Sequence, residues 1–172
     1  MTARAFPSGT PAYLGFLPRF LFSSEGPRAG YVVKAWLLAL LPSLLLASAI
    51  TVAAPVSEAP NLPFSGARLV VLLVVVTPLL ETLLMIPPLW ALRRIAGPGA
   101  ASVASALLWG VVHSLAVPVW GLVAWWPFLI LSVALLTWRE RGLVGAVVTV
   151  ACIHALQNAV SLALPRLLGL AA

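Results

Sequence analysis

Long apolar runs separated by short polar stretches dominate the chain. A helix that crosses a bilayer needs about 20 mostly apolar residues, and runs of that length recur along the sequence. Prolines, glycines and charges concentrate in 57–67, 95–99 and 139–142, where they break helices. The pattern predicts about five spans, over 32–54, 68–92, 99–117, 119–138 and 143–163.

These runs predict an all-α fold, a polytopic transmembrane helix bundle. We expect residues 31–172 to form the transmembrane domain and residues 1–30 to form a cytoplasmic or interfacial segment. Pro87-Pro88 indicates a kink or a helix end in the second span. The third span carries small residues at every fourth position, which lets another helix approach closely and indicates a central position in the bundle. These residues are Ser102, Ala106, Gly110 and Ser114.

Composition supports the membrane class. Of the 172 residues, 62% are hydrophobic and 8% are charged, whereas soluble domains carry about 25% charged residues. Mean hydropathy is +1.10, and the length fits one bundle rather than two domains. The single cysteine, Cys152, excludes an intramolecular disulfide, and we expect it to act as a small apolar core residue.

The charge of +6 does not indicate nucleic-acid binding, because basic residues of membrane proteins gather at the cytoplasmic ends of their helices. With a cytoplasmic N-terminus and five spans, the outer ends receive only Arg68 and Arg166. The inner ends receive the other basic residues, which are Arg4, Arg19, Arg28, Lys34, Arg93, Arg94, Arg139 and Arg141. The alanine-, leucine- and arginine-rich composition favours a bacterial inner membrane, with the lipid bilayer as an obligatory partner.

A few polar residues interrupt the apolar runs. Glu81 is the only acid between Glu58 and Glu140, and both histidines, His113 and His154, lie inside predicted spans. A charge at the bilayer centre costs about 2.5–3.5 kcal/mol on insertion scales, so such residues are functional candidates by default. His154 and Asn158 are four residues apart and share a helix face, as do Trp109 and His113; Gln157 lies beside Asn158.

This set of side chains suits hydrolysis. A glutamate can act as general base on a water that a histidine holds, and a second histidine with an asparagine amide can donate hydrogen bonds to an oxyanion. Two alternatives stay open. Glu81 and a histidine could be a polar clamp without chemistry, or Glu81, His113 and His154 could ligate Zn²⁺. The sequence lacks HExxH, GxSG and any aspartate, which disfavours zinc, serine and aspartyl intramembrane proteases.

Three motifs occur in order on apolar helices: PLLETLLMI (78–86), WGVVH (109–113) and HALQN (154–158). They resemble the three motifs, roughly EExxxR, FxxxH and HxxxN, of the CAAX protease and bacteriocin-processing family of glutamic intramembrane proteases. The resemblance covers about 80 residues, from Pro78 to Asn158. It implies that Glu81 activates water with His113 as its partner. It also implies that His154 and Asn158 form the oxyanion hole.

The resemblance therefore implies a metal-independent endopeptidase without a cofactor, which cuts a membrane protein or peptide in or beside the bilayer. The first motif departs from the family, because Thr82 replaces its second glutamate and Ile86 replaces its arginine. Loss of both partners together removes a buried ion pair without stranding one charge. The alternative is a degenerate scaffold or immunity protein that uses the same pocket for binding. Substrate identity and oligomeric state stay open.

Overall fold

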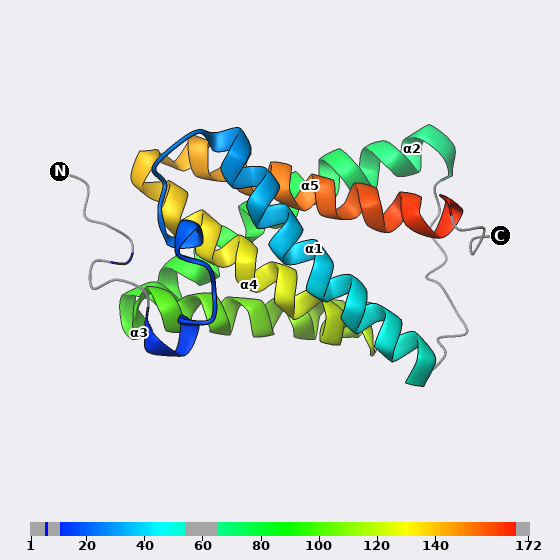
Figure 1. The fold of residues 1–172 in the computed structure, drawn as a ribbon, viewed down its shortest axis with the longest axis horizontal. Helices are drawn as coiled ribbons and strands as arrows, with labels where there is room; N and C mark the ends of the chain where they lie inside the picture. The colour runs from blue at the N-terminus through cyan, green and yellow to red at the C-terminus, as the bar shows by residue number, and fades with distance from the viewer. Residues whose placement is uncertain (1–5, 7–10, 54–64, 168–172) are drawn as a thin grey trace.

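The computed structural model describes residue 6 and residues 11–53 and 65–167, which leaves Arg4 and most of the connection 57–67 outside the described residues. These ranges contain helices and no strand, which confirms the predicted all-α class (Figure 1). The helices are α1 (Arg28–Ala53), α2 (Gly66–Val71), α3 (Thr77–Ala116), α4 (Trp120–Trp138) and α5 (Leu143–Leu167). Shorter turns are the 3-10 turns η1 (Ala12–Leu14), η2 (Arg19–Phe22) and η4 (Arg139–Arg141) and the π-helical turn η3 (Leu72–Val76).

Four helical segments of the described residues are long and apolar enough to cross a membrane. They are Arg28–Ala53, Gly66–Ala116, Trp120–Arg141 and Leu143–Leu164. Three of them correspond to the expected spans 32–54, 119–138 and 143–163. The other combines the expected spans 68–92 and 99–117 in one segment of 51 residues, so the count of five spans stays a prediction.

Gly97 interrupts the long helix α3. Its φ of 77° and ψ of 171° are non-helical and fall in a backbone region that is essentially restricted to glycine. The following Pro98 also disfavours helical dihedrals at residue 97. Figure 1 shows α3 reaching one end of the bundle and then returning along α4. The expected break at Pro87-Pro88 is wrong as a helix end, because the helix continues through both prolines and only Gly97 has non-helical dihedrals inside α3.

Helix α4 occupies the centre of the bundle. Every residue from Pro127 to Trp138 is buried, and α1, α3 and α5 all contact this helix (Figure 1). The small residues of the third predicted span face α4: a Cβ added to Gly121 would meet the Gly110 carbonyl. Ser132 also donates a hydrogen bond to Ser105 across this contact, at 3.0 Å. The small-residue stripe thus marks a close helix contact, but the segment that is buried at every residue is the part of α4 from Pro127 to Trp138.

Side chains from neighbouring helices satisfy carbonyls that prolines leave without a donor. Pro42 lies inside α1 and cannot donate to the Leu38 carbonyl four residues earlier. The Trp126 indole N–H of α4 donates to that carbonyl at 2.9 Å. Prolines in membrane helices are tolerated where such partners exist, so this contact also fixes how α1 crosses α4.

The described part of the N-terminal segment covers one end of the bundle. Leu14, Leu17 and Leu21 are buried in the same hydrophobic core as α4. The Leu21 carbonyl accepts two hydrogen bonds, from the Tyr31 hydroxyl at 2.9 Å and from the Thr137 hydroxyl at 3.0 Å. Apolar burial and this double hydrogen bond hold residues 11–27 against α1 and α4.

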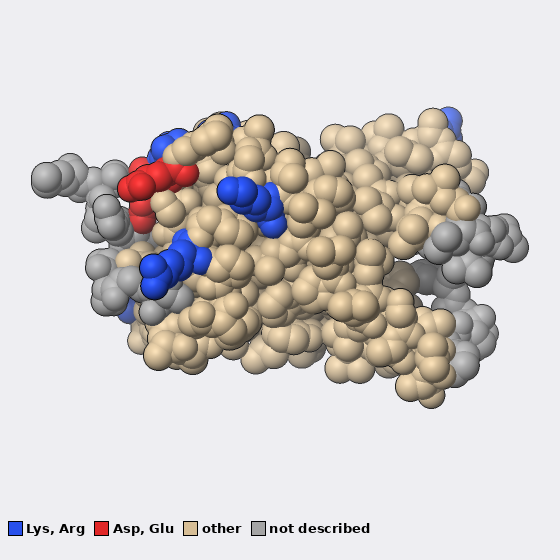
Figure 2. All heavy atoms as spheres, viewed as in Figure 1, with Lys and Arg blue, Asp and Glu red and all other residues tan. Residues whose placement is uncertain are grey.

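On the face drawn in Figure 2, most charged side chains lie at this same end, and a small blue area lies at the opposite end, over α2 (Figures 1 and 2). The guanidinium groups of Arg28 and Arg141 lie 5.2 Å and 5.3 Å from the Trp138 ring. Arg139 lies 5.1 Å from the Trp90 ring of α3. These contacts join the start of α1, the middle of α3 and the end of α4 in one basic face, which is flanked by large aromatic rings.

Candidate active site

Glu81 of α3 meets His154 of α5 inside the bundle. The Glu81 Oε2 and His154 Nε2 atoms are 3.3 Å apart, and the two side chains are 20% and 6% exposed. An ionisable side chain in an apolar bundle needs a partner, because water does not solvate it there. Each of these residues supplies that partner to the other, either as a carboxylate–imidazolium pair or as a hydrogen bond. The structure therefore brings two of the four predicted site residues into contact.

The π-helical turn one turn before Glu81 has a local cause in the sequence. The Thr77 N–H donates to the Leu72 carbonyl, five residues earlier. The next bond of this kind would join residue 78 to the Leu73 carbonyl, but Pro78 has no N–H. The Asn158 side-chain amide of α5 donates to the Leu73 carbonyl at 2.9 Å instead. Such π-bulges are frequent at functional sites, and here the bulge ties Glu81 and its helix to α5.

His113 belongs to an aromatic group formed by α3, α4 and α5. Its Nδ1 lies 2.8 Å from the Trp109 carbonyl. Because a carbonyl can only accept, Nδ1 carries the proton of this hydrogen bond, and in the neutral form of the imidazole Nε2 is then the acceptor nitrogen. The Phe128 ring lies between the histidines, 5.1 Å from the His113 ring and 5.4 Å from the His154 ring, and stacks on Trp109 at 4.7 Å.

The structure thus differs from the expected pairing. Glu81 contacts His154, and within the described residues His113 makes neither a hydrogen bond nor an ion pair with Glu81. Asn158 comes from the same helix as His154, but its amide holds a backbone carbonyl. The catalytic roles of Glu81, His113, His154 and Asn158 stay predictions.

Within the described part of the chain, three buried polar atoms that belong to residues at most three positions from Glu81 or His154 in the sequence have no hydrogen-bond partner. They are the Thr82 hydroxyl oxygen, the Gln157 amide oxygen and the His154 Nδ1. Sequence reasoning placed Gln157 in the membrane but not in the site. Its spacing of three residues from His154 was the available signal, because residues three apart are neighbours on a helix.

The zinc alternative requires a third ligand close to Glu81 and His154. Among the described residues, no three histidine, cysteine, aspartate or glutamate side chains come together in a way that could hold a metal ion.

Cys152 is exposed on the bundle surface, so the expectation that it is a core residue is wrong. Lipid-facing and core-facing positions of a membrane helix are both apolar, which is why the sequence did not distinguish them.

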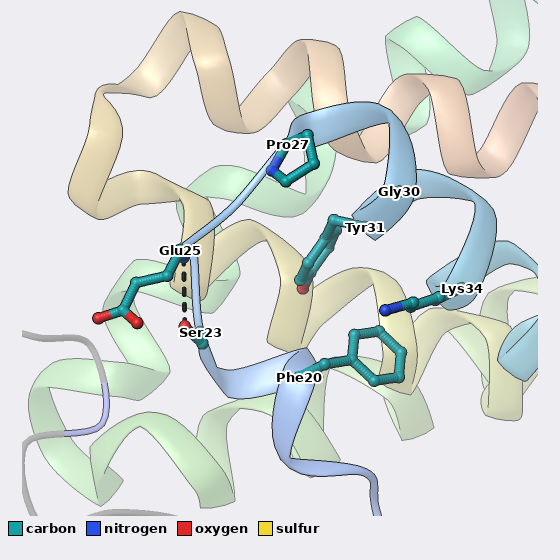
Figure 3. A pocket seen from close by; sticks show the side chains of 7 residues that line it. All are labelled: Phe20, Ser23, Glu25, Pro27, Gly30, Tyr31 and Lys34. Carbon is teal, nitrogen blue, oxygen red and sulfur yellow. Dashed lines mark hydrogen bonds between the residues drawn. The ribbon is translucent and has the colours of Figure 1, made fainter.

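One hollow lies next to Asn158 on α5, and another lies at the charged end of the bundle. An apolar groove of about 390 Å³ runs between the α2–η3 segment and the second half of α5, directly after Asn158. It is lined by Gly66, Val70, Val74, Ala159, Leu162 and Ala163. A second cavity, of about 200 Å³, lies at the charged end between η2 and the start of α1 (Figure 3). Lys34 points into it beside Phe20, and none of the four candidate residues lines it.

Comparisons with known proteins do not show a family for this chain. No protein-family model matches the sequence, and no curated protein or solved structure matches it. The resemblance to the glutamic intramembrane proteases therefore rests on the three sequence motifs alone.

Proposed function

We propose that the chain is an integral-membrane endopeptidase of the CAAX-protease-like glutamic type. The observation that carries this proposal is the contact of Glu81 with His154 at 3.3 Å within an apolar bundle. A carboxylate beside an imidazole in a water-poor interior is suited to general acid–base chemistry. Asn158, one turn later on α5, adds a side-chain amide to the polar groups of Glu81 and His154.

The proposed reaction uses one water molecule and one peptide bond. Glu81 takes a proton from the water, and the resulting hydroxide forms a bond to the scissile carbonyl carbon. When Glu81 holds the proton it no longer accepts from His154, and the His154 Nε2–H then donates to the oxyanion together with the second N–H of the Asn158 amide. The carbon–nitrogen bond then breaks as Glu81 returns its proton to the leaving amine. His113, with an acceptor Nε2, helps to hold the water.

We further propose five crossings with a cytoplasmic N-terminus, in a bacterial inner membrane. A straight helix of 51 residues would be about 76 Å long, more than twice the roughly 30 Å hydrocarbon core, whereas the turn at Gly97 divides it into two segments of spanning length. The basic face formed by Arg28, Arg139 and Arg141 supports the cytoplasmic assignment of that end.

The apolar groove beside Asn158 is the proposed entry for an apolar substrate segment. Its lining is apolar and lies between helices, so an apolar peptide could enter it from the bilayer and lie beside Asn158. Ala163→Trp, which fills the groove, should lower kcat/KM for an apolar peptide at least about 10-fold, the scale of a pocket contact worth 1–3 kcal/mol. Val144→Trp, on the same helix but 78% exposed, is the matched control and should leave cleavage unchanged.

The direct test is Glu81→Gln, which keeps shape and removes the base. Wild type, Glu81→Gln and the control Glu25→Gln are incubated in bicelles with a library of apolar 20-residue peptides, and new termini are identified by mass spectrometry. We expect cleavage by wild type and by the control and none by Glu81→Gln. Equal cleavage by all three would exclude Glu81 as the base.

A second candidate function is a binding-only scaffold or immunity protein. The observation that favours it is the Asn158 amide, which holds the Leu73 carbonyl, together with Thr82 and Ile86 in place of the family's charged pair. If wild type is inert in the cleavage assay and Thr82→Glu combined with Ile86→Arg gains activity, the binding-only function is correct.

A further inference from the structure

The cavity at the charged end of the bundle contains a cation without an anionic partner. This cavity of about 200 Å³ is lined by residues of η2, the connection after it and the first turns of α1. Lys34 points into it (Figure 3), and its Nζ atom lies 5.9 Å from the centre of the Phe20 ring. Among the described residues, no carboxylate forms a salt bridge with Lys34. The ammonium group is therefore available to an anionic ligand, and lysine is a common phosphate-binding residue.

Two more hydrogen-bond donors line the same cavity. The Ser23 oxygen accepts from the Glu25 N–H at 3.2 Å, and the Ser23 O–H has no acceptor in the described part of the chain. The Gly30 N–H, in the first turn of α1, also has no acceptor within the described ranges, as is usual where a helix begins. The Tyr31 hydroxyl, in contrast, already donates to the Leu21 carbonyl. The cavity thus offers an ammonium, a hydroxyl and an amide donor, which suits a ligand with several anionic oxygens.

Glu25 is the acid among the residues that line this cavity. Figure 3 shows its carboxylate pointing away from Lys34 and Tyr31, and the residue is exposed. Because water solvates an exposed carboxylate, its effect on Lys34 is screened. Lys34 is therefore the charged side chain that faces the interior of the cavity, which favours a ligand with a net negative charge.

An exposed apolar strip of α1 continues from Lys34 toward the middle of the helix. Leu37, Leu41 and Leu45 follow Lys34 at spacings of three, four and four residues, which places all four on one helix face. The three leucines are 40%, 56% and 74% exposed. A phospholipid has the same order of groups, with a phosphate at one end and an acyl chain beyond it, whereas a free phosphate matches only the cation.

We propose that the cavity between η2 and α1 binds the head group of an anionic phospholipid of the phosphatidylglycerol type. Its phosphate accepts hydrogen bonds from the Lys34 Nζ, the Ser23 hydroxyl and the Gly30 N–H, and an acyl chain lies along the apolar strip. The bound lipid then joins η2 to α1 at the head-group level of the membrane. None of the four candidate catalytic residues lines this cavity, so the lipid site is independent of the proposed cleavage reaction.

Native mass spectrometry of the full chain in detergent micelles, titrated with dioleoylphosphatidylglycerol, tests the site. We expect Lys34→Gln to weaken binding about 10-fold, the effect of one charge-assisted hydrogen bond. Ser23→Ala, which changes no charge, should weaken binding about 3-fold, and it keeps the test open if Lys34→Gln does not fold. The matched control is Arg94→Gln, which removes an exposed cation of α3 outside the cavity and should leave the affinity unchanged. Equal losses in Lys34→Gln and Arg94→Gln, or unchanged binding in Lys34→Gln and Ser23→Ala, would overturn the proposal.

Three further ligands distinguish an anionic lipid from other phosphate compounds in the same assay. Glycerophosphoglycerol and inorganic phosphate lack acyl chains and should bind wild type at least about 10-fold more weakly than the lipid, because they leave the apolar strip uncovered. Dioleoylphosphatidylcholine has the same chains but no net charge, and it should bind more weakly with no further loss in Lys34→Gln. Binding of glycerophosphoglycerol as tight as that of the lipid would overturn the lipid assignment, and so would equal binding of the two lipids. These measurements need no substrate, so a failure of the proposed protease activity would leave them unaffected.

Discussion

Replacing Asn158 with leucine removes the amide hydrogen bond to the Leu73 carbonyl at almost constant side-chain volume. The carbonyl cannot bond to its own helix, because the residue five positions later is Pro78. Hydrogen bonds between membrane helices average about 0.6 kcal/mol and reach about 1.7 kcal/mol, and a buried group left without a partner costs about 1–3 kcal/mol. We therefore expect Asn158→Leu to lower the free energy of unfolding by about 1–2 kcal/mol.

A second substitution separates this explanation from general disruption. Pro78→Ala restores a backbone N–H at position 78, which gives the Leu73 carbonyl a donor from its own helix. In that background Asn158→Leu should cost less than about 0.5 kcal/mol, so the double-mutant cycle has a coupling energy of about 1 kcal/mol. The assay is reversible unfolding of the four proteins in mixed micelles, followed by circular dichroism. An equal cost of Asn158→Leu in both backgrounds would refute the link between Asn158 and the proline-freed carbonyl.

Two further predictions use the same unfolding assay. Trp126→Phe should lower the free energy of unfolding by about 0.6–1.7 kcal/mol, because the Leu38 carbonyl loses its donor. The loss should be much smaller in a Pro42→Ala background, where residue 42 has a backbone N–H again. An equal loss in both backgrounds would contradict this explanation. Gly97→Ala should cost about 1–3 kcal/mol, because its φ of 77° and ψ of 171° are essentially restricted to glycine. Gly30→Ala, within α1 and with no neighbour closer than 4.0 Å to an added Cβ, should be neutral or stabilising, and a similar loss at both glycines would refute the backbone argument.

Helix content and most helix ends could be predicted because they depend on local sequence, whereas the end expected at Pro87-Pro88 was wrong. Three of the spanning segments begin and end within a few residues of the predicted limits, and Gly97-Pro98 marks a break by its own backbone preferences. The enclosure of α4 could not be predicted. Lipid and protein interior are both apolar, so hydropathy does not tell a helix surrounded by helices from one surrounded by lipid. The exposure of Cys152 was misjudged for the same reason.

The candidate site was predictable in part. The cost of a buried charge predicted that Glu81 would face a partner inside the bundle, and the structure supplies His154. Which histidine it meets depends on the order in which the helices pack, and residue spacing within one helix does not contain that information. The role of Asn158 at the Leu73 carbonyl also required the structure, because it depends on how the π-helical turn lies against α5.

The central claim is that Glu81 activates water for attack on a peptide bond. Cleavage in water enriched in ¹⁸O, followed by mass spectrometry of the new carboxyl termini, measures that step directly. We expect wild type to place one ¹⁸O atom in each new carboxylate and Glu81→Gln to place none, with both proteins equally folded by circular dichroism. Equal incorporation by wild type and Glu81→Gln would contradict the claim, and so would wild-type products without label.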